Sequence, residues 1–185
     1  MHGGYRPCAT SLGGAITAPH CCGMTTNTTA APSLGLAPHD VHAVTANDVR
    51  RFVYTWFTLF EHRAPAERLA AHLTASQPLS LTFPGAEPLR DIQQFTDWYK
   101  QLLANTTWNF HELSGITVEL AEAASYDVSI DIGWQGAVTE DSAWPTNLPE
   151  RRFHFDVRQR WQVAVHPGSA QDDPFYIVNL VAEPL

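Results

Sequence analysis

Residues 126–134 read YDVSIDIGW, and residues 153–165 read FHFDVRQRWQVAV. In both stretches a large apolar side chain alternates with a polar or small residue, which is the pattern of a strand with one buried face. The polar segment 137–151 between them holds Pro145 and Pro149 and predicts a connecting loop. We therefore expect two long strands that each contribute one face to a hydrophobic core.

Further strands are predicted on both sides of this pair. Residues 108–120 are β-rich, with a bulge expected at Ser114-Gly115, and a last strand runs over residues 175–182. A short alternating stretch, residues 79–83, adds a smaller strand earlier in the chain. Long consecutive strands with one apolar face each favour a mostly antiparallel sheet that curves around the elements covering that face.

Helical patterns occupy the chain before the long strands. Thr45 and Asp48 form a capping pattern that opens an amphipathic helix ending near residue 63. A shorter helix is predicted over residues 65–73, and a third over residues 91–105. Helices followed by an antiparallel meander indicate an α+β domain, with the sheet wrapped around the N-terminal helices, over residues 45–185.

Residues 1–44 are predicted to be a disordered tail. The first 39 residues contain no Asp or Glu and are rich in small and polar residues, so they offer little apolar surface to bury. Met24 starts a plausible alternative N-terminus, and we expect residues 1–23 to derive from an upstream start codon. The three cysteines, Cys8, Cys21 and Cys22, fit no zinc-binding spacing, so no metal or cofactor is expected.

Composition limits the partners of this chain. The formal net charge is -8, which disfavours nucleic-acid binding, and no apolar stretch is long enough to cross a bilayer. Residues 45–185 contain no cysteine, which suits a reducing cytoplasm.

The order and lengths of these elements resemble the SnoaL-like branch of the nuclear transport factor 2-like superfamily. The stretches that carry the resemblance are VRRFVYTWFTLFEHR (49–63), PAERLAAHL (65–73), LSLTFPG (79–85), DIQQFTDWYKQLL (91–103), NFHELSGITVEL (109–120) and RQRWQVAV (158–165). The resemblance implies a cone-shaped α+β barrel with a pocket between the curved sheet and the helices. It also implies homodimers that associate through the outer face of the sheet.

That superfamily contains isomerases, dehydratases, cyclases and non-catalytic subunits, so the fold does not give the function. The ketosteroid isomerases use an Asp base, a Tyr and a protonated Asp. The corresponding positions hold Phe83, Phe52 and Gln159 in this chain. The resemblance therefore does not extend to that catalytic machinery.

His111 and Tyr54 are the candidate catalytic residues. A histidine early in its strand can act as an acid or base near neutral pH, but the sequence assigns His111 no partner carboxylate, which favours a structural role. Tyr54 lies beside the apolar stripe of the first helix, from which its hydroxyl could reach a cavity.

The candidate ligand-binding residues lie among the apolar positions. Gln159 is the polar side chain on an otherwise apolar strand face, where it could orient a ligand or be satisfied by backbone or water. The aromatic residues expected to line a pocket, or else to fill the core, are Trp56, Phe83, Trp98 and Trp134. His154 and Asp156 share a polar face with Arg158 and Arg160, which favours ion pairs over a metal site. The preceding strand carries Asp127 and Asp131 on its corresponding polar face, and these are the expected partners of the two arginines.

Two functions remain open at this level. One is a pocket enzyme of isomerase, dehydratase or cyclase type that uses acid–base chemistry on an apolar small molecule. The other is a non-catalytic binding protein or accessory subunit, like the small subunit of ring-hydroxylating dioxygenases. The sequence does not decide whether the protein is an enzyme.

Overall fold

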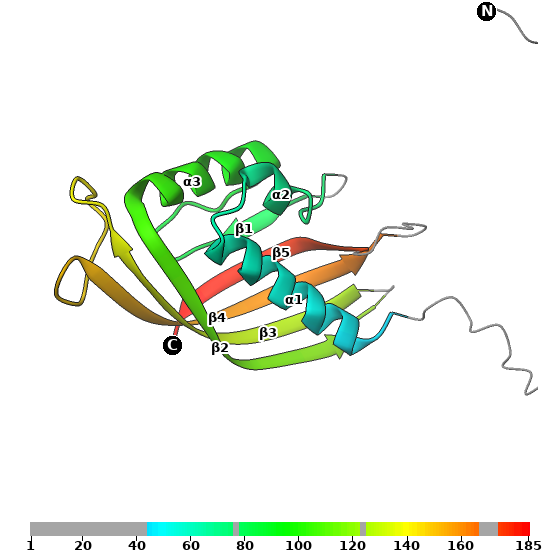
Figure 1. Cartoon of the computed structure of the whole chain (residues 1–185). Coiled ribbons are helices and arrows are strands. Elements are labelled where there is room, and N and C mark those ends of the chain that lie inside the picture. Colours follow the sequence, from blue (N-terminus) through cyan, green and yellow to red (C-terminus); the bar gives the residue numbers. More distant parts are fainter. Residues whose placement is uncertain (1–43, 76–77, 123–124, 167–173) are drawn as a thin grey trace, which may run out of the picture. The chain divides into compact units, whose positions relative to one another are not determined.

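The computed structural model describes residues 44–75, 78–122, 125–166 and 174–185. These residues belong to one compact unit, Val41–Leu185 (Figure 1). Residues 1–43 of the predicted tail, with the alternative start at Met24 and the three cysteines, lie outside the described residues. Among the described helices, none is both long and apolar enough to cross a membrane.

Three helices form where the sequence predicts them. Helix α1 spans Ala46–Glu61, α2 spans Ala66–Ala70, and α3 spans Ile92–Asn105. The capping box at Thr45 is present: Asp48 N donates to Thr45 Oγ1 at 3.3 Å, and Thr45 N donates to Asp48 Oδ2 at 2.9 Å. Such caps satisfy backbone N–H groups that have no partner within the helix, and so they fix where it begins.

The strands are β1 (Ser80–Thr82), β2 (Thr106–Leu120), β3 (Ser125–Val138), β4 (Arg152–Val165) and β5 (Phe175–Pro184). They form one sheet in the order β1-β5-β4-β3-β2, in which β2 to β5 are an antiparallel meander and β1 pairs parallel to β5. The predicted bulge is confirmed by a register shift between Leu113 and Gly115. The predicted loop 137–151 was too long at its start, because Ala137 and Val138 still pair with β2.

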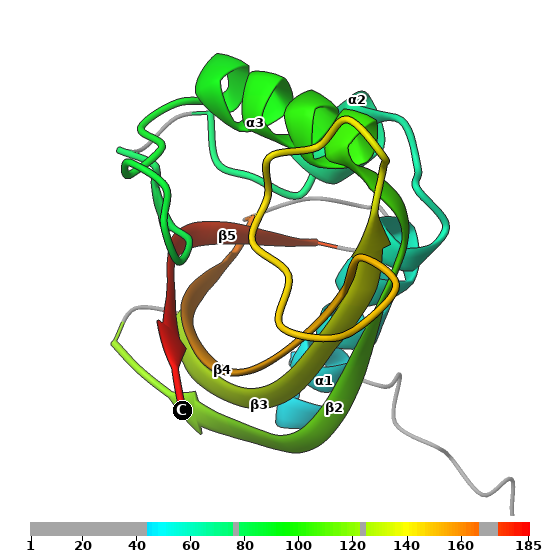
Figure 2. The same cartoon turned by 90° about the vertical axis from the view of Figure 1, so that its left-hand side faces the viewer.

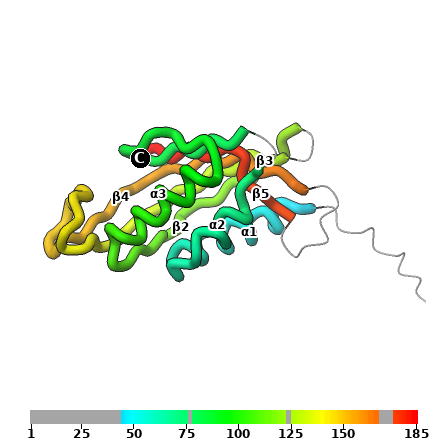
Figure 3. The backbone as a smooth tube through the Cα atoms, turned by 90° about the horizontal axis from the view of Figure 1, so that it is seen from above, coloured from blue at the N-terminus to red at the C-terminus, as the bar shows by residue number. Residues whose placement is uncertain are grey.

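The long strands bend into a half-barrel that holds the helices on its inner face. Figure 2 looks along this half-barrel, with α3 across its open side, and Figure 3 shows all three helices on the same side of the sheet. The predicted α+β architecture is therefore confirmed. Its curvature follows from strand twist and from the apolar inner face that each strand turns toward the helices.

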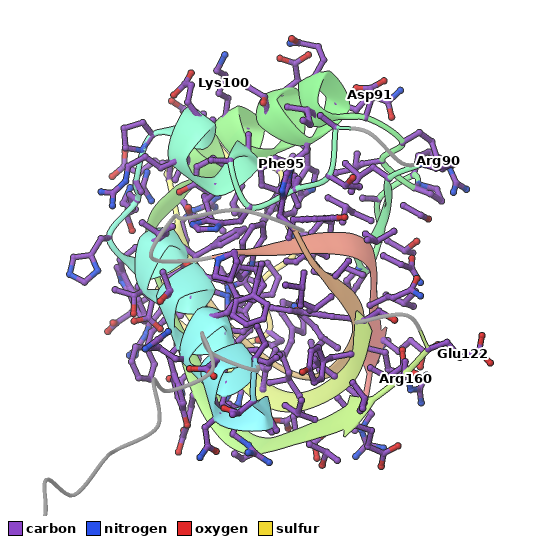
Figure 4. All side chains as sticks on the ribbon, turned by 90° about the vertical axis from the view of Figure 1, so that its right-hand side faces the viewer. Arg90, Asp91, Phe95, Lys100, Glu122 and Arg160 are labelled. Carbon is purple, nitrogen blue, oxygen red and sulfur yellow. The ribbon has the colours of Figure 1, made fainter. Side chains whose placement is uncertain are left out.

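The core is built largely from aromatic rings. Trp161 of β4, 2% exposed, lies 6.0 Å from the ring of Trp56 and 5.7 Å from the ring of Phe57, both on α1. Phe95 points from α3 into the interior, whereas Lys100 on the same helix points away (Figure 4). Each buried ring of this size contributes roughly 1.5–3 kcal/mol, so this packing holds the helices against the sheet.

The outer face of the sheet carries the ion pairs. Arg158 binds Asp131 on the neighbouring strand at 2.7 Å, as the sequence predicts. Arg160 instead binds Glu183 of β5, also at 2.7 Å, and its predicted pairing with an Asp of β3 is not observed. Ser129 stands opposite Arg160 on β3, so the carboxylate within its reach comes from the other neighbouring strand.

Candidate active site

His111 projects from β2 toward the end of α1. β2 is an edge strand whose only neighbour is β3, so backbone groups that point away from β3 need other partners. Glu61, the last residue of α1, supplies one, because the His111 backbone N–H donates to Glu61 Oε1 at 3.0 Å. The same carboxylate oxygen lies 3.9 Å from Nδ1 of the imidazole. One carboxylate therefore holds the backbone of His111 and stands next to its ring.

The helix end explains how Glu61 reaches this position. Phe57 lies one turn earlier on the same face of α1, and its ring centroid is 5.0 Å from that of His111. The helix ends at Glu61 with His62 as its C-cap, and Arg63 adopts a left-handed backbone conformation with φ of 50°. Because residues four apart share a helix face, the face that packs Phe57 against His111 also delivers the Glu61 carboxylate.

Aromatic rings enclose the imidazole on several sides. Trp134 of β3 stacks on it with ring planes 3° apart and centroids 6.0 Å apart, and Phe60 lies 6.0 Å away at a steep angle. The His111 side chain is only 8% exposed. Burial lowers the pKa of His111 from 6.5 to about 3, so the ring is neutral at pH 7.

A second set of polar side chains lies close to His111 and Glu61, near the start of β2. Arg63 donates to Thr106 Oγ1 at 3.2 Å and also to the backbone oxygen of Leu103. Asn109 comes between Thr106 and His111 on β2 and is only 6% exposed. Tyr99 of α3 is fully buried, and burial raises its pKa to about 12, with the nearby Arg63 acting in the opposite direction. Its phenol therefore keeps its proton.

The loop between β3 and β4 closes the end of the half-barrel near these residues (Figure 2). Trp144 from this loop meets the Trp134 ring edge-on, with centroids 6.3 Å apart. Arg151 braces the loop by donating to the backbone oxygens of Thr139 at 3.1 Å and Ser142 at 2.6 Å. His111, Trp134 and Trp144 thus form a continuous series of ring contacts that ends in a loop residue.

The structure brings only part of the predicted set of site residues to His111. Trp134 lies against it, whereas Tyr54 is 55% exposed on α1 and does not reach it. Gln159 accepts a hydrogen bond from Trp161 Nε1 at 2.8 Å, which is a partner within the protein. Trp56 is buried in the helix–sheet core at 2% exposure.

Phe83 and Trp98 form a pair of their own. Their rings stack with centroids 4.0 Å apart and planes 6° apart, joining the segment after β1 to α3. This contact accounts for both side chains by packing.

No metal centre is formed by the described residues, where no three His, Cys, Asp or Glu side chains are grouped to hold one. His154 Nε2 lies 3.3 Å from Asp156 Oδ1 on the outer face, as an exposed pair. A hollow of about 470 Å³ also lies on the outer face of the sheet, lined by polar side chains that include Thr117, Asp127 and Asn179. It is on the opposite side of the sheet from His111.

Sequence reasoning missed Glu61, Tyr99 and Asn109. A signal for Glu61 was available, because a carboxylate in the last turn of a helix opposes the helix dipole and needs a local reason. For Asn109, the alternation of β2 places it on the same face as His111. The helical spacing places Tyr99 on the apolar face of α3, but it does not show that the Tyr99 hydroxyl has no hydrogen-bond partner among the described residues.

Comparison with known proteins gives a result only at the level of structure. No family model matches the chain, and no curated protein sequence matches it. Among solved structures, a protein assigned as a dehydratase of the NTF2-like family from Streptomyces avermitilis has a TM-score of 0.60 and 14% identity, covering 75% of this chain and 95% of that one. The fold is that of the nuclear transport factor 2-like proteins.

Two further structures with this nuclear transport factor 2-like fold are similar to the chain. One is a nuclear transport factor 2-like superfamily protein from Salmonella enterica serovar Typhimurium, with a TM-score of 0.59, 12% identity, and coverage of 75% of this chain and 89% of that one. The other is the hexachlorocyclohexane dehydrochlorinase LinA-type3 from Novosphingobium barchaimii, with a TM-score of 0.58, 11% identity, and coverage of 75% and 84%. At these identities the likeness establishes the nuclear transport factor 2-like fold and no more.

Proposed function

We propose that this protein is an acid–base enzyme in which His111, assisted by Glu61, removes a proton from a small and largely apolar molecule. The observation that carries the proposal is a buried, neutral imidazole with one carboxylate oxygen 3.9 Å from its Nδ1. A neutral imidazole can accept a proton on Nε2 while Nδ1–H donates to a carboxylate. The carboxylate then stabilises the imidazolium as it forms.

The His111–Glu61 geometry in the structure is not arranged for proton transfer. A pKa of about 3 makes His111 a weak base, and 3.9 Å is too long for a hydrogen bond between Nδ1 and Glu61. Catalytic hydrogen bonds often tighten only when substrate binds. Shortening this contact by about 1 Å would form the hydrogen bond, raise the pKa of His111 and bring the imidazole closer to the operating range of a general base.

The aromatic surroundings support an apolar substrate. Phe57, Phe60 and Trp134 present ring faces and edges to the imidazole, and such walls bind apolar rings. Trp144 belongs to the β3–β4 loop and contacts Trp134, the ring that lies against His111, so its displacement would free Trp134 to move without breaking the pairing of β3 with β4. A pocket that opens in this way is part of the proposal.

Proton removal beside a leaving group is the first part of an elimination. The solved structures similar to this chain include a protein assigned as a dehydratase and a dehydrochlorinase, and both names denote eliminations. We therefore favour elimination, the loss of water or of halide, as the reaction class. The proton moves from carbon to Nε2, the electron pair of the C–H bond forms the new double bond, and the leaving group takes the electron pair of its bond to carbon. Where the leaving group is a hydroxyl, the imidazolium returns the proton to the departing oxygen, so that water is released.

A panel of β-hydroxy cyclic ketones and chlorinated cyclohexanes, followed by NMR for the new alkene, tests this function. We expect turnover of at least one class, a loss of about a hundredfold or more in His111→Gln, and a smaller loss in Glu61→Gln. His62→Gln is the matched control, because His62 is an exposed histidine next to Glu61 whose ring bonds Thr58 O. Saturable binding without turnover, or a His111→Gln rate within a few-fold of wild type, would instead support the non-catalytic alternative.

A further inference from the structure

Several buried polar side chains near His111 have no hydrogen-bond partner among the described residues. The atoms are Tyr99 Oη, both Nδ2 and Oδ1 of Asn109, His111 Nδ1 and Trp134 Nε1, with Thr74 Oγ1 elsewhere. A buried polar group without a partner is costly, and native proteins leave few of them. Four such side chains in one region call for a hydrogen-bonding partner beyond the described residues, either water or a small molecule.

Ring contacts and strand register show that these groups are neighbours. Phe60 lies 5.1 Å from the ring of Tyr99 and 6.0 Å from that of His111, so it connects α3 to β2. Trp134 stacks directly on His111. Asn109 precedes His111 by two residues on the same face of β2, where regular pairing with β3 places Gly136 opposite it.

The position opposite Asn109 is built without a side chain. A Cβ on Gly136 would lie 2.4 Å from Cζ of Phe153 and 2.8 Å from the backbone oxygen of Trp108. The Phe153 ring therefore covers Gly136 and provides an apolar wall beside the Asn109 amide. The region combines apolar walls with unsatisfied hydrogen-bonding atoms, which is the composition of a small-molecule site.

We propose that Asn109 and Tyr99 form a specificity-determining subsite that hydrogen-bonds a hydroxyl group on the ring compound bound beside His111. A hydroxyl accepts from Asn109 Nδ2–H and donates to Asn109 Oδ1, so one group satisfies both atoms of the amide. Tyr99 O–H and Trp134 Nε1–H are further donors for the same oxygen or for a second one. This inference rests on the proposed function for its location and extends it by selecting oxygenated substrates over purely halogenated ones.

Three probes of similar size separate the contributions of donor and acceptor. Cyclohexanol can satisfy both atoms of Asn109, cyclohexanone only the donor, and methylenecyclohexane neither. NMR titration of the wild-type protein should give the tightest binding for cyclohexanol and about thirtyfold weaker binding for methylenecyclohexane, the ratio expected for two hydrogen bonds of ordinary strength. Equal affinities for the three probes, or no saturable binding of cyclohexanol, would overturn the proposal.

Single-residue variants show which side chain causes the difference in affinity between the probes. Asn109→Leu should bring the cyclohexanol and methylenecyclohexane affinities to within about twofold, and Tyr99→Phe should reduce their ratio by a smaller amount. Tyr54→Phe is the matched control, because Tyr54 is 55% exposed on α1, and it should leave the ratio unchanged. Asn109→Leu should unfold at the same temperature as wild type or higher, since it removes an unsatisfied amide. A lower unfolding temperature with an unchanged affinity ratio would show that Asn109 is structural.

The outcome of this binding test can be distinguished from the outcome of the catalysis test. His111→Gln removes the proposed base but keeps Asn109 and Tyr99, so it should abolish turnover and leave the affinity ratio intact. If His111 proves non-catalytic, the ratio in wild type and in Asn109→Leu still decides whether this subsite exists.

Discussion

The burial of His111 predicts that acid destabilises this protein through one identifiable residue. Its pKa is about 3 in the folded state, against 6.5 for an unperturbed histidine. The unfolded chain therefore binds a proton as the pH falls below 6.5, and the folded chain does not until about pH 3. By linkage the stability is fully present above pH 6.5 and is lost progressively between pH 6.5 and pH 3. The loss from His111 amounts to about 2 kcal/mol at pH 5.

Urea unfolding of wild type and His111→Gln at pH 8 and pH 5 measures this loss. Wild type should lose about 2 kcal/mol more than the variant between the two pH values, because the variant keeps every other titrating group. The other described histidines are present in both proteins, so their contributions to the loss of stability cancel when the two losses are subtracted. If both proteins lose the same free energy of unfolding, the imidazole is not buried as described, or Glu61 already holds it protonated. Either result would refute our account of the surroundings of His111.

Three further expectations concern the scaffold. Gly136→Ala should lower the free energy of unfolding by about 1–3 kcal/mol in urea titrations, because its Cβ would contact Phe153 and the Trp108 backbone at 2.4–2.8 Å; unchanged stability would contradict that packing. Thr45→Ala should lose about 1 kcal/mol through the α1 cap, and a circular dichroism melt equal to wild type would argue against the capping box. Association through the outer sheet face stays a prediction: sedimentation equilibrium should give about twice the 20.5 kDa chain mass, and a monomer mass would refute it.

The fold could be predicted from the sequence because its determinants are local. Thr45 with Asp48, Asp91 with Gln94, and the two-residue alternation of β3 and β4 each specify one element from within that element. Element order then restricts the topology to an antiparallel meander covered by helices. The end of β3 was misjudged, because Gly136 and Ala137 are too small to show whether the alternation continues.

The site could not be predicted to the same extent, because its determinants are non-local. Glu61 and His111 are fifty residues apart and meet only when the end of α1 lies along β2. The strand pattern identified His111 as a candidate but could not supply its carboxylate. Tyr54 was chosen for its place beside the apolar stripe of α1, yet the helix is rotated so that it faces solvent. Such a rotation depends on which partner each helix face meets.

The position of β5 between β1 and β4 imposes an order on how this protein can assemble. Ser80 of β1 pairs with Asn179 of β5, a contact between residues about one hundred positions apart. Until the last strand of the meander has been synthesised and has docked, the described pairing of β1 is limited to the local bridge between Leu81 and Leu89. A nascent chain can form α1 and the β2–β3–β4 meander, while the edges of β1 and β4 that will pair with β5 remain open. Contacts of such long sequence separation slow folding, and the unpaired edge of β4 is the surface most open to association with other chains in that interval.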